Sequence, residues 1–121
     1  MRVVLVVDDD DTIRGVIRAV LEADQFRVVE ATDGEAALAM LADWQDGDRP
    51  DIVVLDVMMP GIDGIEVCRR IDHAAVRVLM LTARDDPETQ RASKEAGASD
   101  FLGKPFSAVE LLDAVEALVR S

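Results

Sequence analysis

Five short apolar segments recur along the chain at intervals of about 25 residues, beginning near positions 2, 27, 52, 76 and 100. They are rich in valine, leucine and isoleucine and have the length of β-strands. Three of them, VVLVV, IVVL and VLML, are apolar without alternation, as strands buried on both faces are. The second and fifth, RVVEA and DFLG, mix apolar with charged residues. The pattern therefore predicts five strands, with the second and fifth at the edges of a sheet.

The segments between these strands have the periodicity of amphipathic helices. In the first, apolar residues three and four apart form one stripe: Ile13, Val16, Ile17, Val20 and Leu21. The second begins after Asp33, which suits an N-cap, and the third spans residues 65–71. The fourth spans residues 87–96, with proline in its first turn and glycine directly after its last. The fifth has on its apolar side Val109, Leu112, Val115 and Val119.

Strands that alternate with helices predict an α/β fold, a doubly wound parallel sheet with helices on both faces. Burial of the first, third and fourth strands favours the flavodoxin-like order 2-1-3-4-5. In that order ligands bind at the carboxyl ends of the strands, where strands one and three meet. A chain of 121 residues suits one compact domain. We therefore expect a single domain over residues 1–121 with five strands and five helices.

Chemically active residues follow the ends of these strands. Asp8 and Asp9 follow the first strand, and Asp56 ends the third. Carboxylates brought together there would raise one another's pKa, and a hard cation such as Mg²⁺ removes that conflict. Thr82 ends the fourth strand and Lys104 the fifth, which adds a hydroxyl and an ammonium. Such a set can hold a phosphoryl group with one carboxylate as the nucleophile.

The run of aspartates that begins at Asp8 continues through Asp10 and Asp11 into the first helix. We interpret Asp10 and Asp11 as residues that cap the free N–H groups of this helix and suit the positive end of its dipole. The run then divides into one pair that belongs to a metal site and one pair that starts a helix.

Composition excludes several classes of function. A net charge of −12 disfavours direct nucleic-acid binding, because phosphate contacts need clustered lysine and arginine. No apolar run approaches the roughly 20 residues that span a bilayer, so we expect no membrane insertion. The single cysteine, Cys68, suits a reducing cytoplasm. His73 is the only histidine, and we interpret it as structural or incidental rather than as a phosphohistidine donor.

Four stretches of the chain resemble the receiver domain of two-component response regulators. They are VVDDD at 6–10, DIVVLDVMMPGIDGIEV at 51–67, LTAR at 81–84 and GASDFLGKPFS at 97–107. They follow the order and spacing of that family, and the resemblance covers essentially the whole chain. It implies that Asp56 is a phospho-acceptor. By the same resemblance, the phosphoryl donor would be a sensor histidine kinase or a histidine phosphotransfer protein.

The resemblance also implies a ligand set for the metal. Mg²⁺, with Mn²⁺ as the alternative ion, would be held by Asp8, Asp9, Asp56 and the backbone carbonyl of Met58. The reaction is Mg-dependent in that family. The chain would be a signalling phosphoprotein that catalyses only its own phosphoryl transfer and dephosphorylation, and not an enzyme in the usual sense.

Further residues acquire roles in the same way. Lys104 would pair with the phosphoryl oxygens and form a cis peptide bond with Pro105, while Thr82 and Phe101 would respond to phosphorylation as a switch. The switch would remodel the surface of the fourth helix, fifth strand and fifth helix, which contacts an output domain or a downstream protein. The chain would be a cytoplasmic monomer or a phosphorylation-dependent homodimer. The sequence leaves open whether an output domain follows residue 121.

Two other functions remain open from the sequence. Asp8, Asp10 and Thr12 spell DxDxT, the nucleophile motif of haloacid-dehalogenase phosphatases, in which Asp8 would be the nucleophile and Asp10 the acid/base. That motif leaves Asp56 unexplained. The second alternative is a pseudo-receiver, an interaction module that keeps the fold and works without phosphorylation.

Overall fold

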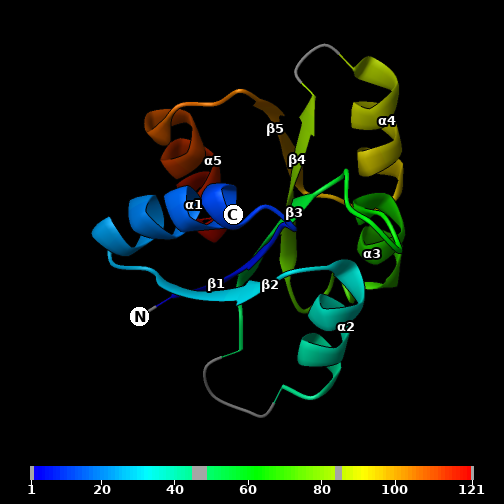
Figure 1. The fold of residues 1–121 in the computed structure, drawn as a ribbon, viewed down its shortest axis with the longest axis horizontal. Coiled ribbons are helices and arrows are strands. Elements are labelled where there is room, and N and C mark those ends of the chain that lie inside the picture. The colour runs from blue at the N-terminus through cyan, green and yellow to red at the C-terminus, as the bar shows by residue number, and fades with distance from the viewer. Residues whose placement is uncertain (1, 45–48, 84–85, 121) are drawn as a thin grey trace.

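The computed structural model describes residues 2–44, 49–83 and 86–120 (Figure 1). Strands and helices alternate along it as predicted. The elements are β1 (Val3–Val7), α1 (Asp11–Ala23), β2 (Arg27–Ala31), α2 (Gly34–Ala42), β3 (Ile52–Asp56), α3 (Gly64–Arg70), β4 (Arg77–Ala83), α4 (Pro87–Glu95), β5 (Asp100–Lys104) and α5 (Ala108–Arg120). Arg84, the last residue of the LTAR stretch, lies outside the described residues. In the described part of the chain, no helix is long and apolar enough to cross a bilayer.

The five strands form one parallel sheet in the order β2-β1-β3-β4-β5, which confirms the flavodoxin-like prediction. In the central pair, Val7 of β1 lies opposite Leu55 of β3. The residue after Val7 is Asp8, and the residue after Leu55 is Asp56. The register of β1 and β3 therefore brings these two carboxylates to the same edge of the sheet.

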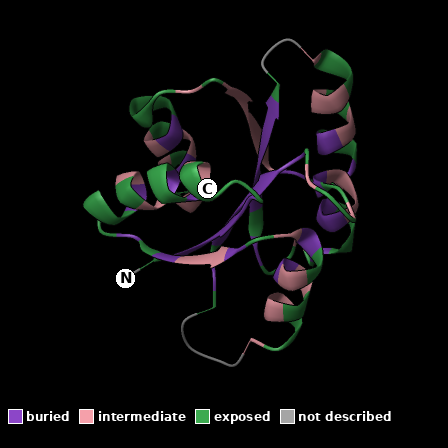
Figure 2. Cartoon of the chain, in the orientation of Figure 1, coloured by how far each residue is buried: buried purple, intermediate pink, exposed green. Residues whose placement is uncertain are grey.

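Helices cover both faces of the sheet, and the sheet between them is largely buried (Figures 1 and 2). Each face carries its own cluster of buried apolar residues. On one face α1 and α5 cover the sheet through Ile17, Leu21, Leu111 and Val115. On the other face α2 and α3 cover it through Ala37, Val67 and Cys68, and α4 lies on the same side. Every residue of β1 and β3 is buried, whereas β2 and β5 are only partly buried. The strand compositions therefore identified the central and edge strands correctly.

In α1 and α5, the face that packs on the sheet differs from the apolar face predicted from the sequence. The residues of α1 that are buried are Arg14, Ile17 and Leu21, whereas Val16 is 56% exposed. In α5 the buried residues are Leu111, Val115 and Leu118, whereas Val109 is 66% exposed. Both helices carry more apolar residues than one face against the sheet can take, so the apolar pattern alone did not fix which of them face the core.

Aspartates cap four of the helices. Asp10, Asp33, Asp63 and Asp86 each accept hydrogen bonds from backbone N–H groups in the first turn of α1, α2, α3 and α4. The predicted caps at Asp10 and Asp33 are confirmed. Asp11 lies in the first turn of α1, as expected for an acidic residue at the positive end of the dipole. Its expected capping role is wrong, because its carboxylate pairs with the Arg14 guanidinium instead of with backbone N–H groups.

Gly64, the first residue of α3, packs directly on the end of β3. A Cβ atom there would lie 2.2 Å from the Asp56 carbonyl oxygen and 2.8 Å from the Val57 Cα atom. Both neighbours are backbone, so neither can move without disturbing the strand that carries Asp56. A residue without a side chain is therefore required where α3 crosses this strand end.

We expect Gly64→Ala to lower the free energy of unfolding by about 2 kcal/mol, because the added methyl group overpacks this contact. Urea denaturation measures the change. The matched control is Gly15→Ala in α1, where a Cβ atom would meet nothing within 4 Å. Since alanine is the better helix former, the control should be about 0.5–1 kcal/mol more stable than the parent. Equal stability of the two variants would contradict the close packing at Gly64.

Candidate functional site

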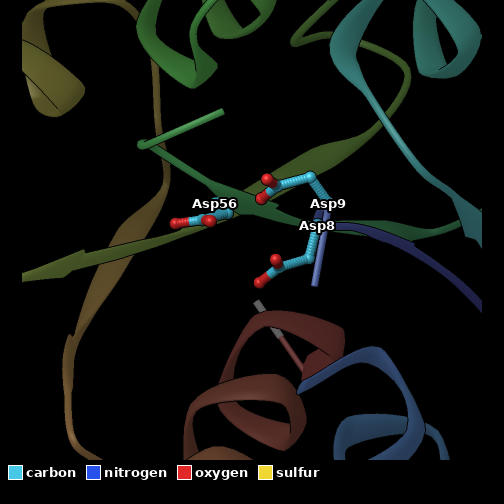
Figure 3. Close-up of side chains that lie close together, drawn as sticks. All are labelled: Asp8, Asp9 and Asp56. Atoms are coloured by element: carbon cyan, nitrogen blue, oxygen red, sulfur yellow. The ribbon is translucent and has the colours of Figure 1, made fainter. Parts of the chain in front are cut away.

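The predicted site residues gather at the carboxyl edge of the sheet. Asp8 and Asp9 follow β1, Asp56 ends β3, Thr82 lies near the end of β4 and Lys104 ends β5. One carboxylate oxygen from each of the three aspartates lies within 4.8 Å of the others. Figure 3 shows these three side chains grouped beside the strand ends. Asp8 and Asp56 are buried, with 1% and 4% of their surfaces exposed, whereas Asp9 is open to solvent.

Asp8 is held by contacts from three neighbouring segments. Its amide donates to the Ala31 carbonyl of β2 at 3.3 Å, and its Oδ1 atom accepts from the Asp10 amide at 2.9 Å. Its carbonyl accepts from the Arg14 guanidinium at 2.7 Å. The remaining polar atom, Oδ2, is buried and has no hydrogen-bond partner among the described residues. A buried carboxylate oxygen without a partner is costly in the absence of a ligand or cation.

The pKa of Asp8 is raised above its ordinary value. Burial is the main cause, because it removes water from the charged form, and the negative charge of Asp56 acts in the same direction. The hydrogen bond from the Asp10 amide and the ammonium of Lys104 oppose these effects but do not cancel them. The site therefore contains a carboxylate whose charged form is insufficiently stabilised by the protein itself.

Lys104 supplies the positive charge at this edge. Its Nζ atom donates to the Asp56 Oδ1 atom at 3.0 Å. The same Nζ lies 3.9 Å from the Asp8 Oδ2 atom, too far for a hydrogen bond but close enough for charge attraction. The Asp56 Oδ1 atom also accepts from the Met58 amide at 3.3 Å. The peptide bond between Lys104 and Pro105 is cis. The Lys104 ammonium thus lies close to the carboxylates of both Asp56 and Asp8.

Thr82 lies on β4, which pairs with the strand of Asp56, and Phe101 lies on β5, the next strand beyond β4. The Thr82 side chain is buried, and its hydroxyl donates to the Ala83 carbonyl at 3.3 Å. Phe101 of β5 is partly buried against the apolar layer on the side of α2 and α3. The Lys94 Nζ atom of α4 lies 5.6 Å from the centre of its ring, within the range of a cation–π contact. Phe101 thus lies between the sheet and α4.

The donor set fits a hard divalent cation. Carboxylate oxygens from Asp8, Asp9 and Asp56 are the ligands that Mg²⁺ prefers. The unpartnered Oδ2 atom of Asp8 has the charge and the environment that such an ion would satisfy. The exposed side of Asp9 leaves room for the waters that Mg²⁺ usually keeps.

Arg14 is the residue at this site that sequence reasoning missed. The helical pattern marks it as a charged position, yet only 8% of it is exposed. Its guanidinium donates to the Asp8 carbonyl, to Glu30 at 3.0 Å and to Asp11. A usable signal was present, since Arg14 lies one position after Ile13 and three before Ile17 on the apolar side of α1.

Comparisons with known proteins agree with this geometry. The family model for the response regulator receiver domain matches residues 4–116. The response regulator MprA of Mycolicibacterium vanbaalenii is 46% identical over 119 residues, which are 97% of this chain and 50% of that protein. The MprA protein of Mycobacterium tuberculosis CDC 1551 is similar to the same extent. The chain therefore spans about half the length of the curated relatives it matches.

Solved structures show the same fold. The chemotaxis response regulator CheY4 of Vibrio cholerae superposes with a TM-score of 0.87 at 33% identity, covering 98% of both chains. The receiver domain of the Francisella response regulator 1452 gives a TM-score of 0.87 at 32% identity, covering 99% of this chain and 98% of the other. Taken with the family match over residues 4–116, these likenesses identify the chain as a member of the response regulator receiver domain family of two-component signalling.

Proposed function

We propose that Asp56 accepts a phosphoryl group from a histidine of a sensor kinase or a histidine phosphotransfer protein, in a Mg²⁺-dependent reaction. The observation that carries this proposal is the setting of the Asp56 carboxylate. It is buried, it accepts a hydrogen bond from the Lys104 ammonium at 3.0 Å, and it lies beside the acidic pair Asp8 and Asp9. A nucleophile, a fixed cation and the ligands for a metal therefore share one edge of the sheet.

In the proposed reaction, a carboxylate oxygen of Asp56 forms a bond to phosphorus while the bond from phosphorus to the donor's histidine nitrogen breaks. The electron pair of the broken bond leaves with that nitrogen. Mg²⁺, when held by Asp8, Asp9, Asp56 and the Met58 carbonyl, supplies positive charge for the phosphoryl oxygens. The Lys104 ammonium is already directed at Asp56, so it needs only a small movement to reach an oxygen of the new phosphoryl group.

The proposed output surface lies on the side of Lys104 and Phe101, on α4, β5 and α5. A phosphoryl group on Asp56 would draw the Thr82 hydroxyl away from the Ala83 carbonyl, and Phe101 would turn inward behind it. The surface would have two conformations that exist before phosphorylation, and the phosphoryl group would shift the population from one to the other. An output domain or downstream protein would read the surface, either on a monomer or on a phosphorylation-dependent homodimer. The cytoplasm is the proposed setting.

Incubation with Mg²⁺ and a small phosphodonor such as acetyl phosphate tests the proposal. We expect one alkali-labile acyl phosphate per chain, with no incorporation when EDTA replaces Mg²⁺. Intact-protein mass spectrometry measures the added phosphoryl group. A chain that neither binds Mg²⁺ nor incorporates phosphate would instead be a pseudo-receiver.

The haloacid-dehalogenase alternative lacks support at Asp10. The Asp10 carboxylate accepts hydrogen bonds from the amides of Thr12 and Ile13, at 2.8 and 3.2 Å. Both hydrogen bonds go to the Asp10 Oδ1 atom and make this residue the N-cap of α1. The structure therefore gives Asp10 a capping role, which the acid/base role of the DxDxT motif would have to displace.

We expect Lys104→Ala to uncouple phosphorylation from partner binding while Mg²⁺ binding is kept. The variant retains all three carboxylates, but it removes the cation that would hold the phosphoryl oxygens. Calorimetric titration with Mg²⁺ should give an affinity at least as high as that of the parent, since a competing positive charge is gone. A pull-down with the cognate output partner should then lose its dependence on phosphorylation. Normal phosphorylation-dependent binding would contradict the role given to Lys104.

A further inference from the structure

Arg14 is the one buried basic side chain among the described residues. It extends from the first turns of α1 toward the end of β1, where its Nη1 atom donates to the Asp8 carbonyl at 2.7 Å. Burial of a guanidinium is costly unless its donors are satisfied. Arg14 therefore cannot be explained as a charged residue that keeps the outer face of α1 soluble, and its contacts must account for its burial.

Acidic side chains hold the guanidinium from two further sides. The Nε atom donates to the Glu30 Oε1 atom at 3.0 Å, and the Nη2 atom donates to Asp11. Glu30 lies on the edge strand β2, and its second oxygen accepts from Arg18. Arg18 in turn donates to Glu22 at 3.2 Å. The planar guanidinium is thus fixed between β2 and α1, and only Nη1 reaches the end of β1.

The hydrogen bond from Arg14 is one of three that hold Asp8 in place. The Asp8 amide is held by β2, its Oδ1 atom by the Asp10 amide and its carbonyl by Arg14. Among the described residues, this leaves Oδ2 as the one polar atom of Asp8 without a hydrogen-bond partner. The carbonyl that Arg14 holds belongs to the peptide that joins Asp8 to Asp9. The backbone torsions on either side of this peptide help to set the directions of both side chains, so a hydrogen bond to its carbonyl restrains them together.

We propose that Arg14 is a positioning residue of the metal site, which holds the peptide between Asp8 and Asp9 so that both carboxylates face Asp56. This inference rests on the proposed Mg²⁺-dependent function. Groups that orient metal ligands through hydrogen bonds commonly change metal affinity by 10- to 100-fold when removed. Arginine suits the role because its planar fork engages the carbonyl and the Glu30 carboxylate together.

The direction in which the Mg²⁺ affinity changes when Arg14 is replaced distinguishes a positioning role from a purely electrostatic one. Arg14 is a cation close to the site, so loss of its charge alone would tighten Mg²⁺ binding. Loss of a positioning contact would weaken it. A purely structural role would lower the stability of the fold and leave the Mg²⁺ affinity of the folded chain unchanged.

The experiment is calorimetric titration of Mg²⁺ into the wild-type chain, Arg14→Met and Arg18→Met, each at a temperature at which circular dichroism shows it folded. Arg18→Met is the matched control, because it removes a charge from the same helix and a contact to the same Glu30 but none to Asp8. We expect Arg14→Met to weaken Mg²⁺ binding about tenfold. Arg18→Met should stay within about twofold of the parent.

Arg14→Lys serves as a second variant and covers the case in which Arg14→Met does not fold. It keeps the charge, but one ammonium cannot replace the fork that spans the Asp8 carbonyl and Glu30. We expect it to bind Mg²⁺ about fivefold more weakly than the parent, an intermediate loss within the range for second-shell changes. Unchanged or tighter binding in the folded Arg14 variants, with normal binding by the wild type, would overturn this inference alone. A wild-type chain that binds no Mg²⁺ would overturn the proposed function as well.

Discussion

Asp56→Asn is expected to abolish phosphorylation by a small phosphodonor while leaving the fold intact. The amide that replaces the carboxylate is not an effective nucleophile toward phosphorus, and it carries no charge for Lys104 or a metal ion to balance. We expect neither neighbouring aspartate to take over, because among the described contacts of Lys104 the ammonium donates a hydrogen bond to Asp56 and not to Asp8 or Asp9. Incorporation should therefore fall below detection by intact-protein mass spectrometry.

The control for Asp56→Asn is Asp113→Asn, which removes one negative charge from an exposed position on α5. This variant should incorporate one phosphoryl group, as the parent does. Thermal unfolding should show both variants folded. If phosphorylation of Asp56→Asn continued at a rate near that of the parent, the chain would have a different acceptor.

Asp8→Asn is expected to have two opposite effects, loss of Mg²⁺ binding and a gain in stability of the metal-free chain. The first follows because a neutral amide replaces a buried ligand whose Oδ2 atom has no hydrogen-bond partner in the described part of the chain. The second follows because burial and the charge of Asp56 disfavour the ionised carboxylate at this position. Removing a destabilising functional-site charge commonly adds about 1 kcal/mol to the free energy of unfolding.

The pH dependence of this gain follows from the raised pKa of Asp8. A carboxyl whose pKa is higher in the folded chain is protonated there first, so its contribution to stability is present at low pH and lost as pH rises through the folded pKa. The stability difference between Asp8→Asn and the parent in EDTA should therefore be small below pH about 4, the ordinary aspartate range, and grow toward neutral pH.

Urea denaturation of both chains in EDTA, repeated across this pH range, measures the difference. Titrations shared by the two chains cancel in it. Asp9→Asn is the matched control, because Asp9 is exposed and its replacement should leave metal-free stability nearly unchanged. A neutral-pH destabilisation by Asp8→Asn would show that the buried charge of Asp8 stabilises the fold.

The sequence was sufficient to predict the topology of the sheet and to predict that Asp8 and Asp56 lie close together. Parallel strands of similar length end at one edge, so residues that directly follow β1 and β3 must converge once the strand order is known. The strand order in turn followed from composition, since β1, β3 and β4 contain unbroken runs of apolar residues, whereas β2 and β5 mix charged residues with apolar ones. These inferences rest on patterns that tertiary packing rarely overrides.

Other features depended on packing that one sequence does not specify. The rotation of α1 leaves Val16 in solvent and buries Arg14, an exchange that the spacing of Arg14 permits but that hydrophobic periodicity alone does not select. Burial of Arg14 depends on Glu30, sixteen positions away on a different strand. The partner of Asp11 could not be predicted either, because a helix-start aspartate can bond to backbone N–H groups or to an arginine one turn later.

The central claim is that Asp56 carries the phosphoryl group, and mapping the modified residue tests it most directly. The wild-type chain is incubated with Mg²⁺ and acetyl phosphate, the acyl phosphate is reduced with borohydride, and the modified position is found by peptide mass spectrometry. The proposed function predicts modification of Asp56 within the peptide DIVVLDVMMPGIDGIEV. Modification at Asp8, retained in Asp56→Asn, would contradict it and would favour a phosphatase-type nucleophile.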